Sequence, residues 1–182
     1  ASRLQAIPLF EQEILALLKE LGMPAAQFHI ECQQEKTCSP DGIDRVKFLF
    51  SANKGIPTDE VAKIASGGEL SRLMLSIKSM ISRKNLLPTI IFDEIDSGVS
   101  GDIAGRVGTI LKKMSAQMQV IVITHLPQIA GKGDAHYWVY KEDDRGTTWS
   151  KIRKLTMDER VEEIAKMVSG DNVTNASFQT AK

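Results

Sequence analysis

The sequence has few cysteines, few aromatic residues, no excess charge and no long apolar run. Two cysteines without a second pair, Cys32 and Cys38, predict neither a metal site nor a disulfide framework. The 23 basic residues balance the 23 acidic ones, which excludes a basic surface over the whole molecule but not a local patch. There is no membrane-length run and no secretion signal. We therefore expect a soluble, intracellular protein with one sizeable core, or with one core and a small appendage.

A further absence concerns nucleotide binding. A P-loop reads Gly, four residues, Gly-Lys and then Ser or Thr. The only Gly-Lys pair lies at 131–132, where Gly133 follows it and Leu126 stands in place of the first glycine. The chain therefore lacks this phosphate-binding loop.

Apolar residues recurring at three- and four-residue spacing predict four helices, over 1–21, 66–84, 102–116 and 158–168. A helix accepts Pro8 only near its start, which suggests that residues 1–7 belong to a different element. In the second helix, one face gathers apolar residues: Leu70, Leu73, Met74, Ile77 and Ile81. The start in mid-pattern without an initiator methionine suggests a piece of a longer protein.

Other patterns predict strands, and the fold class is α/β. Alternation at 28–32 and 46–50, around turn-forming residues at 37–42, predicts an antiparallel hairpin. Two further strands are expected at 135–140 and 149–155, around a polar turn at 142–146. The runs 89–92 and 120–123, apolar except for Thr89 and joined by helix 102–116, predict a buried parallel βαβ unit.

The second helix begins with Ser66, Gly67, Gly68 and Glu69. Ser followed three residues later by Glu is also a common capping box. That reading leaves the two glycines unexplained, since each costs up to about 1 kcal/mol relative to alanine within a helix. Positions without side chains let a phosphate approach the backbone N–H groups at the positive end of the helix. The segment therefore favours phosphate binding once its neighbours are considered.

Two acids, Asp93 and Glu94, follow the buried run 89–92. The carboxyl edge of a parallel sheet is where α/β proteins bind ligands. Two adjacent acids suit a division of labour, in which one holds Mg²⁺, usually through water, and the other polarises an attacking water. His125 follows the neighbouring run 120–123 and should lie at the same edge. The sequence thus predicts half of a nucleotide-hydrolysing site.

These motifs together resemble those of ABC ATPases. Residues 66–70 resemble the signature motif, 89–94 the Walker B motif with its catalytic glutamate, 96–101 the D-loop, and His125 the switch histidine. The longer runs 65–72, 91–101 and 123–130 are similar to bacterial RecN, the SMC-like ATPase of DNA double-strand-break repair. The similarity extends from about residue 17 to residue 170. The D-loop reads Gly-Val-Ser-Gly, as in RecN-type proteins, where transporters have Ala-Leu-Asp.

The resemblance implies a P-loop NTPase-type ABC/SMC head with three layers, a mainly parallel sheet, flanking helices and an antiparallel hairpin. SMC-like proteins divide this head between the two ends of the polypeptide, which would explain the missing Walker A motif. Residues 1–21 would end the coiled-coil arm, and 22–182 would form the C-terminal lobe of the head. The fragment alone should be inactive without the N-terminal lobe. The implied location is cytoplasmic and nucleoid-associated, without a membrane.

The resemblance also implies roles for individual residues. Two heads would sandwich two ATP molecules, so that Ser66, Gly67 and Gly68 contact the γ-phosphate bound to the opposite head. Asp93 would assist Mg²⁺, Glu94 would act on the attacking water and His125 would contact the γ-phosphate of its own head. Glu69 of the signature motif and the D-loop pair Asp96 and Ser97 would complete the nucleotide-binding residues. ATP, Mg²⁺, a second head and DNA are the implied partners.

Two alternatives stay open. The chain could be a head lobe of another SMC-like or ABC ATPase, a choice that the sequence upstream would decide. It could also be an interaction module that has lost catalysis, although Glu94 and His125 argue against this. DNA contact rests on the resemblance alone, because the basic residues are interpreted as solvated faces: Lys112, Lys113, Lys151, Arg153 and Lys154.

Overall fold

The computed structural model describes residues 2–40, 42–63, 67–82, 87–93, 95–144, 146–170 and 175–181. The elements in chain order are α1 (Ser2–Glu20), β1 (Gln27–Ser39), β2 (Gly42–Ser51), β3 (Asp59–Glu60), the 3-10 turn η1 (Val61–Lys63), α2 (Gly67–Ser82), β4 (Thr89–Asp93), α3 (Gly101–Ser115), β5 (Gln119–Ile123), α4 (Pro127–Ala130), β6 (Tyr137–Asp144), β7 (Thr147–Lys154), α5 (Met157–Ser169) and α6 (Asn175–Ala181). The protein is α/β, as predicted, with one parallel strand pair and antiparallel hairpins.

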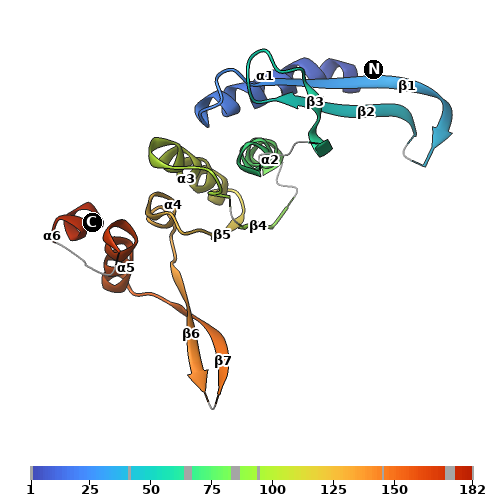
Figure 1. Ribbon diagram of the computed structural model, residues 1–182. Coiled ribbons are helices and arrows are strands. Elements are labelled where there is room, and N and C mark those ends of the chain that lie inside the picture. Colours follow the sequence, from blue (N-terminus) through green and yellow to red (C-terminus); the bar gives the residue numbers. More distant parts are fainter. Residues whose placement is uncertain are drawn as a thin grey trace.

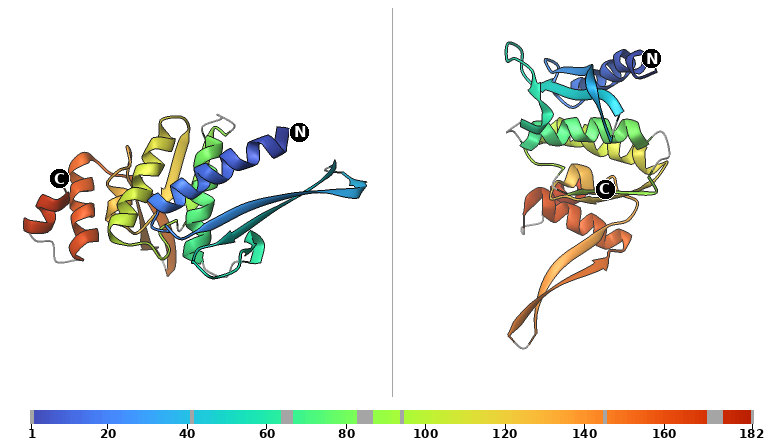
Figure 2. Two further views of the ribbon diagram at one scale, coloured as in Figure 1. Left: turned by 90° about the horizontal axis from the view of Figure 1, so that it is seen from above. Right: turned by 90° about the vertical axis from the view of Figure 1, so that its right-hand side faces the viewer.

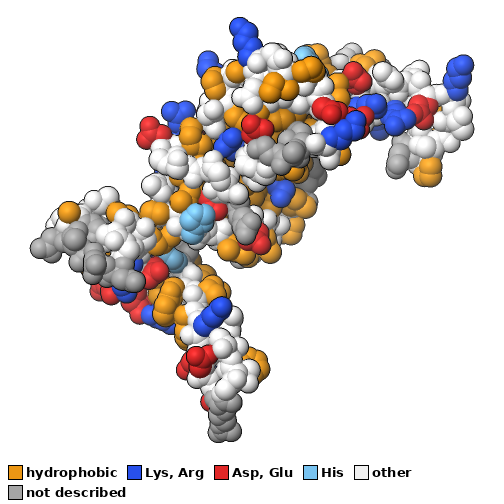
Figure 3. Space-filling view, viewed as in Figure 1, with side chains coloured by type: hydrophobic (Ala, Val, Ile, Leu, Met, Phe, Trp, Pro, Cys, Tyr) orange, Lys and Arg blue, Asp and Glu red, His pale blue; other side chains and the backbone are white. Residues whose placement is uncertain are grey.

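The elements are stacked in layers along the molecule (Figure 1). Helix α1 and the long β1–β2 hairpin form one end, α2 and α3 lie in the next layer, and β4 and β5 follow. The β6–β7 hairpin projects at the opposite end, beyond α4 and α5 (Figure 2). The space-filling view shows the two hairpins as narrow arms that project from a broader body (Figure 3).

Helix α1 covers one face of the N-terminal hairpin. Its residues Ile14 and Leu18 are fully buried and belong to one cluster with Phe28 of β1 and Phe50 of β2. The expectation that residues 1–7 form a separate element is wrong, because α1 runs through Pro8. The carbonyl that loses its partner at Pro8 is that of Leu4, in the exposed first turn of the helix, where water can replace the missing N–H.

The strands of both hairpins extend further than their sequence patterns indicate. Residues 37–39, expected in a turn, belong to β1, which pairs with β2 across a register shift between Gln34 and Ser39. Residues 142–144 likewise belong to β6, opposite the start of β7. Antiparallel pairing supplies partners for backbone groups regardless of side-chain type, so polar residues continue the strands.

Helix α2 packs between two hydrophobic clusters. Leu73 faces the α1–hairpin cluster, whereas Leu75 belongs to the cluster of α3 and β4. The predicted apolar face is therefore partly wrong, because Met74 and Ile81 are exposed while Ser76 and Ser79 are buried. Small serine side chains let two clusters approach the helix from different sides. The Ser76 hydroxyl donates a hydrogen bond to the carbonyl of Arg72, so the buried hydroxyl has a partner.

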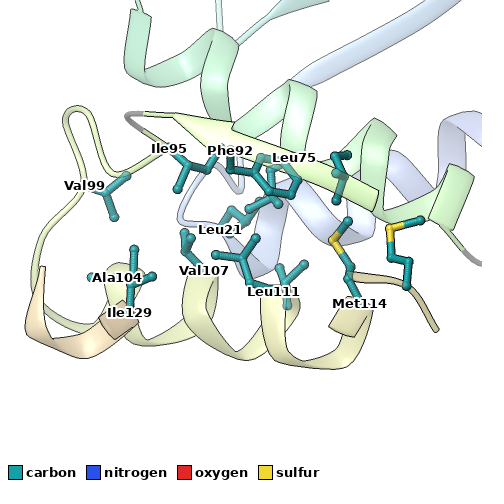
Figure 4. Close-up of a cluster of buried hydrophobic side chains, with 13 residues drawn as sticks. Leu21, Leu75, Phe92, Ile95, Val99, Ala104, Val107, Leu111, Met114 and Ile129 are labelled. Carbon is teal, nitrogen blue, oxygen red and sulfur yellow. The ribbon is translucent and has the colours of Figure 1, made fainter. Parts of the chain in front are cut away.

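The predicted βαβ unit is present, with β4 and β5 parallel and α3 between them in sequence. Figure 4 shows the cluster beneath it, in which Phe92 of β4 meets Val107 and Leu111 of α3. Only one face of the strands is buried. On the other face Ile91 is 58% exposed and Ile123 is 56% exposed. The expectation of two fully buried strands is therefore wrong: the inner face is buried in β4 and partly buried in β5.

The C-terminal part confirms one helix and adds others. Helix α5 begins at a capping box in which the Thr156 side chain accepts from the backbone of Glu159 and the Glu159 side chain accepts from the backbone of Thr156. It ends at Gly170, whose φ of 71° suits glycine. Helices α4 and α6 and the short elements β3 and η1 had no clear sequence signal.

Candidate nucleotide-binding edge

The parallel strands bring two of the predicted site residues to one edge. Asp93 is the last residue of β4 and stands opposite Ile123, the last residue of β5. His125 follows two residues later, and both Asp93 and His125 are exposed. This confirms the expected shared edge, at the carboxyl ends of parallel strands where ligands bind. Glu94 and Ser66 lie outside the described residues.

Asp96 lies close behind this edge and is almost completely buried, with 2% exposure. Its Oδ2 accepts a 2.5 Å hydrogen bond from the Thr124 hydroxyl and a 3.0 Å hydrogen bond from the backbone N–H of His125. Burial is the largest single influence on the Asp96 carboxyl and would raise its pKa. The hydrogen bonds from Thr124, from the backbone N–H of His125 and from the backbone N–H of Asp96 itself, together with the charge of His125, outweigh burial and hold the pKa below its ordinary value. The carboxylate is thus kept charged without reaching the surface.

The segment between β4 and α3 is a tight turn built on two glycines. Gly98 has φ of 68° and Gly101 has φ of 54°, which other residues rarely adopt. Within the turn, the N–H of Val99 donates to the carbonyl of Asp96 at 3.1 Å, and the Val99 side chain is buried. Ser97 is exposed. The turn thus buries Asp96 and Val99 and leaves Ser97 at the surface.

The start of α2 lies against this turn. A Cβ on Gly68 would lie 2.9 Å from the carbonyl oxygen of Ser97, whereas a Cβ on Gly67 would meet nothing within 4 Å. Arg72 supports the same contact, since its Nη1 donates to the carbonyl of Gly98 at 3.4 Å. Gly68 therefore has a packing reason to be glycine. Gly67 is the position whose backbone is left open at the helix start, with Glu69 beside it in the first turn.

The residues present fit a hydrated metal ion better than an all-protein metal site. Among the described residues, no group of three or more His, Cys, Asp or Glu side chains could enclose an ion. Mg²⁺ retains several waters and uses one or two carboxylates together with phosphate oxygens. Asp93, exposed at the edge of the sheet, suits that role. Bound there, the ion would supply charge that offsets the charge of the phosphates.

Sequence reasoning missed two contributors to this edge. Thr124 connects the turn to the switch segment, since it donates to Asp96 and its Oγ1 accepts from the N–H of Leu126 at 3.0 Å. Arg72 connects α2 to the same turn. The only available signal was that Thr124 stands directly between a buried strand and His125.

Curated proteins similar to this chain are DNA repair proteins RecN. That of Rickettsia bellii (strain RML369-C) is 44% identical over 180 residues, which cover 99% of this chain and 33% of that protein. That of Vibrio cholerae serotype O1 is 41% identical over 182 residues, which cover 100% of this chain and 33% of that protein. The chain spans about a third of the length of the curated relatives it matches. No protein-family model matches the chain.

Solved structures of similar shape are heads of SMC proteins. The Smc head domain with a coiled coil and joint from Pyrococcus yayanosii has a TM-score of 0.64 and 19% identity, covering 88% of this chain and 29% of that chain. A structure of SMC ATPases has a TM-score of 0.53 and 17% identity, covering 94% of this chain and 100% of that chain.

The fold is therefore that of an SMC-type ATPase head domain. The chain belongs with RecN, and it corresponds to the C-terminal third of that protein. The described residues include no helix that is both long and apolar enough to cross a membrane.

Proposed function

We propose that this chain is the C-terminal lobe of an ATP-hydrolysing head in a RecN-like protein that acts in DNA double-strand-break repair. The observation that supports the proposal best is the shared edge of β4 and β5, where Asp93 and His125 are exposed together. The relatives are named DNA repair proteins, and they match this chain over 99% and 100% of its length. Residues 1–21 are proposed to end a coiled-coil arm, and 22–182 to form the lobe.

The proposed division of labour assigns one task to each residue. Asp93 would hold Mg²⁺ through water, Glu94 would orient and polarise the attacking water, and His125 would contact the γ-phosphate of the same head. Phosphoryl transfer to water needs chiefly positioning and charge stabilisation, which suits residues held at one rigid edge. Mg²⁺ held by Asp93 would supply positive charge at the transferred group.

A second head would contribute to each nucleotide. Gly67, with open space at the start of α2, suits close approach of a phosphate bound to the opposite head. Ser66, Glu69 and Ser97 would complete this surface. A solved structure of similar fold comes from work on ATP-driven dimerization and DNA-stimulated activation of SMC ATPases. ATP would thereby couple dimerisation of the heads to engagement of DNA.

The N-terminal lobe would bring the missing Walker A motif and cover an apolar surface. The outer face of β4 and β5 exposes three isoleucines, Ile91, Ile121 and Ile123. Such a face is unusual without a partner, because exposed isoleucines of adjacent strands form a continuous apolar patch. We expect the N-terminal lobe to pack on this outer face.

Contact of this chain with DNA is not assigned to its basic residues. Lys112 forms an ion pair with Asp134, Lys151 with Glu142, and Arg153 with Glu159. These cations are already partly neutralised by their neighbours. The proposed role in DNA repair therefore rests on the relatives and not on a basic surface of this chain.

Reconstitution tests the proposal. The purified chain alone should show negligible Mg-ATP turnover, and addition of the N-terminal lobe should restore it. Glu94→Gln should abolish turnover in the reconstituted head while ATP-dependent dimers persist. Glu31→Gln, which makes the same charge change on exposed β1, is the matched control and should leave turnover intact. Turnover by the chain alone, or an active Glu94→Gln head, would contradict the proposal.

A further inference from the structure

Asp96 belongs to the turn after β4, yet its carboxylate is hydrogen-bonded to the segment after β5. Its Oδ2 receives the Thr124 hydroxyl and the backbone N–H of His125, and the Nδ1 atom of His125 lies 3.2 Å from the same oxygen. The Asp96 side chain is 2% exposed, whereas the His125 side chain is 77% exposed. The buried carboxylate of Asp96 thus lies directly behind the solvent-exposed imidazole of His125.

In this conformation the Asp96 side chain is buried and faces the segment after β5, so the nucleotide contact that the D-loop resemblance implied for it stays a prediction. A buried charge is costly unless it is paired and hydrogen-bonded. Among the described residues, the only basic side chain at ion-pair distance from Asp96 is that of His125. The contacts that offset the desolvation cost of the buried Asp96 carboxylate therefore come from the segment that carries His125.

The geometry fixes which nitrogen of the ring can face a ligand. If Nδ1 is turned to Asp96, Nε2 is the nitrogen that points away from the protein. Phosphate oxygens only accept hydrogen bonds, so an Nε2 that contacts a phosphate must carry a proton. With Nδ1 also donating to Asp96, both ring nitrogens are protonated, and the carboxylate balances the charge. A carboxylate behind a histidine has this orienting effect in other catalytic sites.

We propose that Asp96 is a positioning residue for His125: its carboxylate accepts a hydrogen bond from Nδ1–H, fixes the ring orientation, and directs Nε2 toward the γ-phosphate. Thr124 holds the carboxylate in place from the side. The inference rests on the proposed function for the identity of the ligand. The Asp96–His125 contact itself can be tested without hydrolysis.

The first test is a double-mutant cycle on ATP turnover by the intact protein. Asp96→Asn should lower kcat by about 10–100-fold, the range for a group that orients another, with KM for ATP changed much less. His125→Gln should cost at least as much, and the double variant should be no slower than His125→Gln alone. Asp158→Asn, an equal charge change on exposed α5, should leave kcat unchanged. Fully additive losses would overturn the inference.

The second test observes the ring directly. A ¹⁵N spectrum of the histidine-labelled intact protein without nucleotide, with His125 assigned by its absence in His125→Gln, should show that the neutral ring carries its proton on Nδ1. Asp96→Asn should shift the ring toward the tautomer mixture of free histidine. Thr124→Val keeps the carboxylate and should cause a smaller shift, which covers the case that Asp96→Asn fails to fold. A wild-type ring already like free histidine would overturn the inference. If the intact protein does not hydrolyse ATP, the proposed function fails, but this spectrum still decides the contact.

Discussion

The two faces of the β4–β5 pair carry the same kind of side chain in opposite environments. Ile90 and Phe92 are 9% and 3% exposed, whereas Ile91 between them is 58% exposed. Helices α2 and α3 supply the cover on the inner face, and no described residue buries the outer one to the same extent. A strand that is apolar on both faces is typical of a parallel sheet with other elements packed on both of its faces. In this chain, α2 and α3 are the elements that pack on the inner face.

The two hairpins show the same contrast. The N-terminal hairpin lies under α1, and its Phe28 is fully buried. In the β6–β7 hairpin, Val139 and Ile152 stand opposite each other and are 65% and 66% exposed. The hairpin is held internally instead, by Trp138 stacked on Tyr140 with 4.7 Å between ring centroids and by Arg153 over Trp138. The covered and uncovered parts should therefore respond differently to mutation.

The largest expected difference is between neighbouring residues of β4. Phe92→Ala should destabilise the chain by about 3–5 kcal/mol, because it leaves a cavity between α2 and α3. Ile91→Ala should change stability by about 0.5 kcal/mol or less, as for other surface positions. Urea denaturation of the two variants measures both values. Equal losses would show that the outer face is packed in the chain alone.

The outer face should become sensitive once the N-terminal lobe is added. Ile121→Ala should then cost about 2 kcal/mol, the lower end for a buried isoleucine, and weaken binding of the two lobes about 30-fold. The same change should leave the stability of the chain alone nearly unaffected. Titration calorimetry of the two lobes measures the difference, with Ile152→Ala on β7 as a matched exposed control. Unchanged affinity would mean that the lobe docks elsewhere.

Within the covered part, the two glycines of α2 should separate. Gly68→Ala places a Cβ 2.9 Å from the Ser97 carbonyl and should destabilise by about 1–2 kcal/mol through overpacking. Gly67→Ala meets no neighbour and should have no cost, or a small gain from helix propensity. Thermal unfolding of the two variants provides the comparison. A destabilising Gly67→Ala and a neutral Gly68→Ala would contradict the packing described.

The smallest effect concerns the junction between the covered body and the β6–β7 hairpin. Burial lowers the pKa of the half-buried His136, with the charge of Arg160 adding to the effect and Glu163 opposing it. The unfolded chain therefore binds the proton more readily, and stability should fall as the pH drops below the ordinary histidine value of 6.5. His136→Gln should flatten this dependence in urea titrations at several pH values. An unchanged slope would assign the acid sensitivity to other groups.

The sequence predicts those parts in which one pattern has one structural solution. The mostly apolar and β-branched runs 89–92 and 120–123 predict the parallel pair, and the apolar spacing over 158–168 predicts α5, which the structure extends from Met157 to Ser169. Prediction fails where tertiary packing selects among solutions. Helix α2 buries Ser76 and Ser79 because two clusters meet it, and α1 continues through Pro8 because its apolar face is anchored further along.

The candidate site follows the same division. The shared edge of Asp93 and His125 could be predicted, because parallel strands end together. The burial of Asp96 and the close approach of Gly68 to Ser97 could not, because each depends on a contact between segments far apart in the chain. Spacing along the sequence says nothing of which side of a turn faces inward.

The contact between Gly68 and the turn after β4 has a mechanical consequence. No side chain of Gly68 intervenes, so the start of α2 rests almost directly on backbone, and Arg72 adds a second tie to Gly98. In the proposed sandwich, α2 meets the nucleotide of the opposite head, and β4 meets the nucleotide of its own. A displacement at one phosphate would be transmitted to the other without a flexible link to absorb it. Each lobe would then move as a rigid body and couple the two ATP-binding sites to each other.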